Sequence, residues 1–221
     1  MASDPDERGG GRRRTPRQRR SRATVDWIKQ ATLEIAATEG FGAVTTVRVA
    51  ERAGVSVGSL YQYFATREAI LMALYEDTSI RFATSMRKLV GDVLEMPVED
   101  AVRYGATSIL AGYAQNKLVL LDLIDAMPEL HLEWHPVSYE NIVRGAVKAF
   151  VANTIGSVTP SALDRAVFFT ERVMMDSIRA YLRAPPPNLS KRALIDDIAL
   201  MLGQYLAMFA TRELRNNPSP A

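Results

Sequence analysis

Cysteine is absent from the 221-residue sequence, which excludes disulfide bonds, thiolate metal sites and cysteine nucleophiles. Long apolar runs are absent as well, since no stretch reaches the roughly 20 residues that a membrane-spanning helix needs. The arginine-rich N-terminal region is not followed by an apolar segment, as it would be in a secretory signal. We therefore expect a cytoplasmic protein without a membrane partner.

Histidine is nearly absent, and no motif typical of an enzyme is present. The two histidines, His131 and His135, are four residues apart with glutamates nearby, so on a helix they would share a face and could bind a metal. Pro128 and Pro136 interrupt this stretch, however, and favour a structural or ligand-contacting role. There is no glycine-rich phosphate loop, nucleophile motif or dinucleotide fingerprint. The sequence predicts no catalytic residues, no metal site and no cofactor.

Positive charge is concentrated near the N-terminus, although the formal net charge of the whole chain is only +2. Residues 1–22 contain eight arginines and three acidic side chains, whereas residues 23–67 are neutral by the same count. Residues 1–21 are rich in Gly, Arg, Pro and Ser, which predicts a disordered arm. Clustered arginines indicate a polyanionic partner at this end of the chain, and a solvated tail without a specific role is the alternative.

From residue 22 onward, apolar residues recur at helical spacing, and no segment shows a β-hairpin signal. Glycines, prolines and capping residues divide this region. The expected helices cover residues 24–39, 47–53, 57–64, 67–90, 98–115, 118–126, 137–153, 161–183 and 189–215. We predict an all-α fold in which an N-terminal three-helix helix-turn-helix domain (residues 22–68) joins a larger helical ligand-binding and dimerisation domain (residues 69–221).

The sharpest local pattern lies between Thr45 and Arg67, where two short helices meet through a turn of a few residues. Gly54 stands where the chain must reverse, and Leu60 and Phe64 are spaced to anchor the third helix. A helix-turn-helix has this spacing and presents its second helix to the DNA major groove. The side chains expected to meet bases and phosphates are Thr46, Val57, Gly58, Ser59, Tyr61, Gln62, Tyr63 and Arg67. A helical hairpin that binds no nucleic acid has the same spacing, but the basic arm and the outward tyrosines favour DNA.

Four segments of this region carry a specific motif: Val44-Thr45-Thr46, Val49-Ala50-Glu51-Arg52-Ala53-Gly54-Val55-Ser56, Gly58-Ser59-Leu60-Tyr61-Gln62-Tyr63-Phe64 and Arg67-Glu68-Ala69-Ile70-Leu71. Together they closely resemble the N-terminal domain of the TetR/AcrR family of bacterial transcription regulators, over about residues 22–72. The resemblance implies an all-helical homodimer that usually represses transcription and loses DNA affinity when a small molecule enters its C-terminal domain. The family's DNA contacts would fall on Thr46, Val57, Gly58, Ser59, Tyr61, Tyr63 and Arg67. Arg67 replaces the usual lysine, so the phosphate contact should persist.

The C-terminal two thirds match no subfamily, so the effector is not identified by resemblance. Flexible methionines and aromatic side chains are typical of a cavity between helices that holds a small apolar or aromatic molecule. The candidate pocket residues are Met86, Tyr104, Tyr113, Met127, Trp134, Tyr139, Phe168 and Met175. For any single one of them, ordinary core packing is the competing explanation.

The last two expected helices each carry a wide apolar face, which predicts a four-helix interface between two copies of the chain. The residues expected in this interface are Phe169, Val173, Tyr181, Ile198, Leu202, Tyr205 and Phe209. A dimer would place two recognition helices about one DNA turn apart, so we expect a palindromic double-stranded operator.

Three functions remain open at this point. The first is a repressor released from its operator by a small-molecule effector. The second is a DNA-binding regulator without such an effector, controlled by a protein partner or by its abundance. The third, and the least favoured, is an enzyme with an incidental helix-turn-helix.

Overall fold

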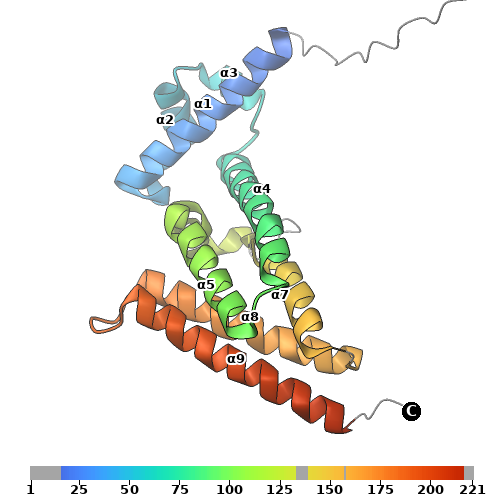
Figure 1. The fold of residues 1–221 in the computed structure, drawn as a ribbon. Helices are drawn as coiled ribbons and strands as arrows, with labels where there is room; N and C mark the ends of the chain where they lie inside the picture. The colour runs from blue at the N-terminus through green and yellow to red at the C-terminus, as the bar shows by residue number, and fades with distance from the viewer. Residues whose placement is uncertain (1–15, 133–138, 157, 217–221) are drawn as a thin grey trace, which may run out of the picture. The chain divides into compact units, whose positions relative to one another are not determined.

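The computed structural model describes residues 16–132, 139–156 and 158–216, and every regular element in these ranges is a helix (Figure 1). The all-α prediction is confirmed. The chain divides into two compact units, Met1–Ile70 and Leu71–Ala221. The sequence places this boundary two residues earlier, after Glu68.

The first unit is built around one long helix and two short ones. It comprises α1 (Pro16–Glu39), the 3-10 turn η1 (Phe41–Ala43), α2 (Thr46–Ala53), α3 (Val57–Tyr61) and the start of α4 (Arg67–Val93). α1 packs mainly against α2, and α2 packs against α3. The buried apolar residues of α1, α2 and α3 are Ile28, Ala31, Ile35, Ala36, Val49, Ala50 and Leu60.

The start of α1 corrects the expected arm. The helix begins at Pro16, well before the predicted Thr24, so residues 16–21 are helical rather than disordered. Proline suits the first turn because its missing N–H needs no partner there, and arginine is a good helix former. The rest of the predicted arm lies outside the described residues.

The second unit continues α4 and adds the remaining helices. They are α5 (Val98–Gln115), η2 (Leu118–Asp122), α6 (Leu123–Ala126), η3 (Pro128–Leu130), α7 (Tyr139–Ile155), α8 (Pro160–Arg183) and α9 (Lys191–Asn216). The single helix expected over 118–126 is divided, because η2 is a π-helical turn. Lys117 Nζ bonds Asp122 Oδ1 at 2.9 Å, a pair five residues apart, which is the spacing of a π turn.

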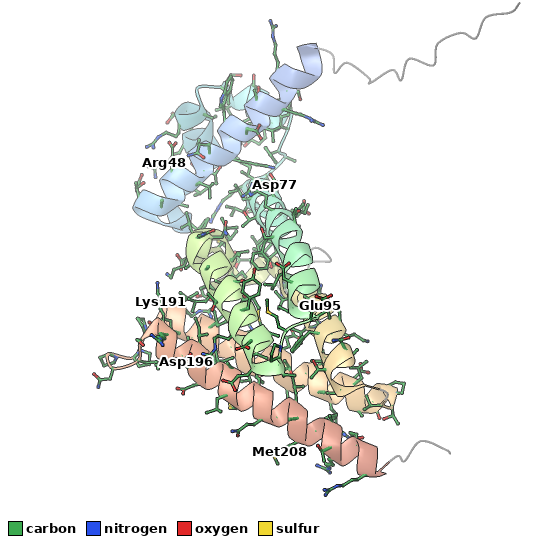
Figure 2. The ribbon with its side chains drawn as sticks, in the orientation of Figure 1. Arg48, Asp77, Glu95, Lys191, Asp196 and Met208 are labelled. Atoms are coloured by element: carbon green, nitrogen blue, oxygen red, sulfur yellow. The ribbon has the colours of Figure 1, made fainter. Side chains whose placement is uncertain are left out.

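α5 lies at the centre of the packing in the second unit. It packs most extensively against α9 and also against α8, while α7 packs against α8 and α9. α8 and α9 run side by side in Figure 1 and contact each other. Arg103 of α5 pairs with Asp196 of α9, which is labelled in Figure 2. The proline-rich segment at residues 185–187 separates α8 from α9, as the sequence predicts.

Candidate functional site

The turn between α2 and α3 is closed by backbone and side-chain hydrogen bonds. Gly54 has φ 68°, a left-handed conformation that glycine adopts without a side-chain clash. Val55 N donates to Ala50 O at 3.0 Å across the turn. Ser56 then caps α3, its Oγ accepting from Ser59 N at 3.0 Å. These bonds fix the direction of α3 as it leaves the turn.

The outer face of α3 presents polar side chains on a buried anchor. Leu60 is fully buried and Phe64 is 8% exposed, whereas Tyr61 is 50% and Tyr63 36% exposed. The Tyr61 hydroxyl lies 3.2 Å from Thr46 Oγ1, so the first turn of α2 and the end of α3 meet at this surface. Large phenol side chains held outward by a packed helix can reach phosphate oxygens.

The remaining predicted DNA-contacting residues divide into two groups. Gly58 and Gln62 are exposed, and Val57 and Ser59 are half-buried at the start of α3. Arg67 is different, because its Nη2 donates to Phe41 O at 3.0 Å in a partly buried bond. Its guanidinium thus holds the loop after α1 to the start of α4, a structural contact that the sequence did not predict.

Two arginines that the sequence did not single out brace this surface. Arg48 Nη2 donates to Glu39 Oε1 at 2.6 Å (Figure 2), and Arg52 Nη1 lies 3.4 Å from Glu34 Oε2. The hydrogen bond from Arg48 lowers the pKa of Glu39. Both pairs join α2 to α1, and their spacing of 9 and 18 residues gives no local sequence signal.

The sequence around this surface matches a family model described as bacterial regulatory proteins, tetR family, over residues 28–74. The helix-turn-helix is thus similar to the N-terminal domain of that family. No curated protein sequence matches the chain.

Solved structures of low sequence identity share the fold. The fatty acid degradation regulator FadR from Bacillus halodurans has a TM-score of 0.62 at 16% identity, covering 86% of this chain and 96% of that one. A regulator from Mesorhizobium loti assigned to the TetR family has a TM-score of 0.61 at 14% identity, covering 90% and 98%. The TetR-family repressor FadR from Thermus thermophilus, in complex with lauroyl-CoA, has a TM-score of 0.51 at 17% identity, covering 89% and 99%. The chain therefore shares its fold with regulators of the TetR family.

The predicted dimer residues lie on two different faces of the second unit. The Phe169 ring lies 6.1 Å from that of Tyr205, which lies 5.6 Å from that of Phe209, so these three form one aromatic row across α8 and α9. Val173 and Tyr181 are half-buried. Ile198 and Leu202 are a correction: both are buried, because that side of α9 belongs to the core of its own chain.

The predicted pocket residues are not brought together. Tyr113, Met127 and Met175 are buried in the core, and Phe168 is 54% exposed beside Phe169. Tyr104 lines a groove between α4 and α5. The side chains of Met86 and Tyr139, and Trp134 as a whole, lie outside the described residues. Aromatic and methionine residues are as typical of a packed core as of a cavity wall, so their presence in the sequence could not locate a pocket. The groove itself is lined mainly by polar residues.

The described residues contain no group of three or more His, Asp or Glu arranged to hold a metal. His131 Nδ1 lies 2.8 Å from Glu129 O, and His135 falls outside the description. One helix segment, Lys191–Glu213, is long and apolar enough to cross a membrane by length and composition. A single such helix is weak evidence, since core and interface helices share this composition.

Proposed function

We propose that this TetR-family regulator is a homodimeric repressor that binds a palindromic operator through α3 and releases it when a small molecule binds the second unit. The observation that carries the proposal is the capped helix-turn-helix, which holds Tyr61 and Tyr63 outward on the face that begins with Val57 and Gly58. The matched family supports DNA binding as the purpose of this face.

The side chains of α3 and the residues just after it are suited to hydrogen-bonding DNA phosphates, and few of them can contact bases. Tyr61 and Tyr63 offer hydroxyl donors to phosphate oxygens, and Ser59 offers a hydroxyl near the helix start. Gly58 leaves open space on its outer side, where a side chain would meet only Ser56 Oγ at 4.0 Å. The α3 backbone can thus approach base edges closely.

An exposed aromatic surface supports the homodimer. Phe168, Phe169, Met201 and Met208 are each at least half exposed, and they border the Tyr205–Phe209 row. Isolated apolar side chains are normal on a surface, but a contiguous patch indicates an interface. A copy of the same surface is the simplest cover, because α8 and α9 would pair in a two-fold four-helix arrangement.

Control by a small molecule is supported by the groove in the second unit and by the continuity of α4. α4 runs without a break from Arg67, inside the first unit, to Val93. A ligand bound against α4 can favour one position of that helix over another and so alter DNA affinity. The lauroyl-CoA complex of the Thermus thermophilus repressor is an example of this fold holding a ligand.

The test begins with selection of binding sites from a random duplex pool, using the full-length chain. Fluorescence anisotropy on the selected duplex then compares wild type with Tyr61→Phe and Tyr63→Phe, which remove only hydroxyl groups. Hydrogen bonds to charged groups contribute about 1.5–3 kcal/mol, so each variant should bind about tenfold more weakly. Thr107→Val, which removes an exposed hydroxyl from α5 outside the groove, is the control and should bind DNA like wild type. Failure to enrich any sequence, or unchanged affinity in the double Tyr61/Tyr63 variant, would contradict the proposal.

A further inference from the structure

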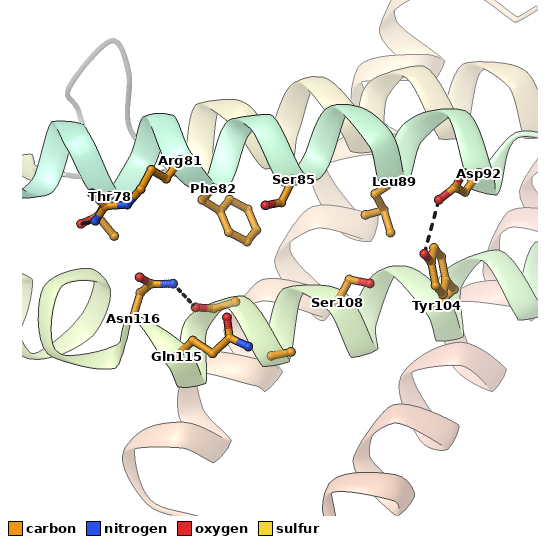
Figure 3. A pocket seen from close by; sticks show the side chains of 12 residues that line it. Thr78, Arg81, Phe82, Ser85, Leu89, Asp92, Tyr104, Ser108, Gln115 and Asn116 are labelled. Carbon is orange, nitrogen blue, oxygen red and sulfur yellow. Dashed lines mark hydrogen bonds between the residues drawn. The ribbon is translucent and has the colours of Figure 1, made fainter.

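A groove of about 380 Å³ lies between α4 and α5 in the second unit (Figure 3). This volume falls within the range of about 300–1,000 Å³ that is typical of small-molecule sites. Eight of its twelve lining residues carry hydrogen-bonding side chains. The groove therefore suits a ligand with a polar part, rather than the wholly apolar molecule expected from the sequence.

One end of the groove carries a cation. Arg81 Nη2 donates to Thr78 Oγ1 at 3.1 Å, and no carboxylate of the described residues forms an ion pair with Arg81. Figure 3 shows Arg81 extending from α4 on the side where Asn116 and Gln115 stand on α5. A guanidinium with free donors binds a carboxylate through two parallel hydrogen bonds, and the Gln115 amide can add a further donor. The Asn116 amide already donates to Gly112 O at 2.9 Å. This end is suited to an organic carboxylate.

The middle of the groove is apolar. The ring of Phe82 packs against α5 at Gly112, where a Cβ would lie 2.3 Å from Phe82 Cε2. Leu89, eight residues beyond Arg81 and about 12 Å farther along the helix axis, also lines the groove. An apolar body can thus extend from the carboxylate over Phe82 towards Leu89.

Beyond Leu89 lies a second, smaller cavity. It has a volume of about 50 Å³, shares Leu89 with the groove, and is lined by apolar side chains from α4, α5, α7, α8 and α9. Its polar member is Thr170, which is 2% exposed and whose Oγ1 has no hydrogen-bond partner in the described part of the chain. The other lining side chains are apolar, so the cavity extends the apolar surface of the groove at Leu89 into the core.

The far end of the groove is acidic. Asp92 accepts a hydrogen bond from the Tyr104 hydroxyl at 3.4 Å, one turn after Leu89 on α4. A second carboxylate at this end would be repelled by Asp92. The groove therefore distinguishes a monocarboxylate from a dicarboxylate of the same length.

We infer that the groove binds a small amphipathic monocarboxylate, with its carboxylate at Arg81 and its apolar chain directed over Phe82 towards Leu89 and the cavity beyond. The inference rests on the proposed function in one respect, that the ligand is the effector. It deepens that proposal by naming the effector's chemical class and the residue that recognises its charge.

The experiment uses the full-length protein and three eight-carbon probes: octanoate, octanamide and octanedioate. Isothermal titration and thermal shift should show that octanoate binds about tenfold more tightly than octanamide or octanedioate. Arg81→Gln should abolish the preference for octanoate over octanamide. Arg192→Gln, which removes the same charge from a side chain that is 93% exposed on α9, should keep it. Leu89→Ala should weaken the binding of dodecanoate, whose longer chain reaches Leu89, while leaving the affinity for octanoate and the preference for its charge unchanged.

Two results would overturn the inference: equal binding of octanoate and octanamide by wild type, or no binding of any probe. Retention of the preference in Arg81→Gln would overturn the assignment of the carboxylate to this end. Operator affinity is also measured on the same preparations without probe. Intact operator binding with no selective octanoate binding would contradict the ligand site alone, whereas absent operator binding would contradict the proposed function. Selective octanoate binding that leaves operator affinity unchanged would retain the site and remove its role as the effector site.

Discussion

At the scale of single residues, Gly112 is the position where the packing of the groove is most constrained. Its missing side chain allows the Phe82 ring to lie against α5, and an added Cβ would meet three atoms of that ring within 3.4 Å. Gly112→Ala gains about 1 kcal/mol of helix propensity but overpacks the site by about 1–3 kcal/mol. We expect a net loss of stability in urea unfolding.

Gly105→Ala provides the control on the same helix, because a Cβ there meets nothing within 4 Å. That variant should be stabilised by about 0.5–1 kcal/mol. Equal effects of the two substitutions would mean that Phe82 moves aside without cost.

The buried carboxylate of Glu171 should depend strongly on one partner. Its side chain is 8% exposed and receives Arg144 Nε at 2.8 Å and Nη2 at 3.1 Å. Arg144→Met leaves the carboxylate without these donors and should cost about 1–3 kcal/mol in thermal unfolding. Adding Glu171→Gln should recover part of the loss. Lys148→Met is the control between the same two helices: its partner Asp164 is 71% exposed at 3.6 Å, so the change should be below about 0.5 kcal/mol.

The Asp125–Arg183 pair predicts a pH dependence of stability. The hydrogen bonds from Arg183, at 2.6 and 2.7 Å, lower the pKa of Asp125. A carboxyl whose folded pKa is depressed contributes stability that is present above its unfolded pKa of about 3.9, and this stability is lost as the pH falls through the folded pKa. Both side chains are more than a third exposed, so the effect should stay below about 1 kcal/mol. Arg183→Gln should therefore lower the urea midpoint at pH 7 and reduce its fall between pH 7 and pH 3; an unchanged fall would contradict this.

At the scale of elements, two glycines in the helix-turn-helix separate folding from DNA binding. Gly54 has φ 68°, so Gly54→Ala should destabilise the unit by about 1–2 kcal/mol. Gly58 lies in α3 with open space around it, so Gly58→Ala should leave the melting temperature unchanged or raise it slightly. Its methyl group would nevertheless stand on the face proposed to meet DNA and should weaken operator binding about tenfold. If Gly58→Ala binds as tightly as wild type, this face of α3 does not approach the bases.

The helix boundaries followed from the sequence wherever a local signal defines them. α5 begins and ends at the predicted residues because Pro97 precedes it and its apolar period ends near Asn116. α3 ends at Tyr61 rather than Phe64, since Tyr63 N and Phe64 N both donate to Leu60 O and tighten the last turn. The early start of α1 could not be read from composition, because arginine favours helix and disorder alike.

At the scale of the whole molecule, the sites that depend on one segment were predictable, and those assembled from several were not. The α3 face is contained in a short stretch, so its exposed tyrosines could be proposed from spacing alone. Arg81 and Asn116 line the same groove only because α4 and α5 lie on opposite sides of it. The apolar residues of α9 likewise lie on both a buried and an exposed face of the helix. Only the packing of α9 against α5 shows that Ile198 lies on the buried face.

The exposed face of α8 and α9 gives the last prediction. Phe169 is 51% exposed at the centre of the aromatic surface, so Phe169→Glu should place a charge in the proposed interface of two copies. Central aromatic residues contribute at least about 2 kcal/mol to such interfaces, so the dimer dissociation constant should rise at least thirtyfold or so, measured by analytical ultracentrifugation. Operator binding should lose affinity in parallel, because both half-sites need one dimer.

Leu200→Glu is the matched control, because Leu200 is 49% exposed on α9 but lies away from the Tyr205–Phe209 row on the helical wheel. This variant should remain dimeric. A lipid surface is the other possible cover for α9, and vesicle flotation tests it. If lipid covers this face, wild type should float with the vesicles and both glutamate variants should bind them more weakly. A wild-type protein that sediments as a monomer without vesicles would leave the aromatic surface solvated, and the palindromic operator would then lose its structural basis.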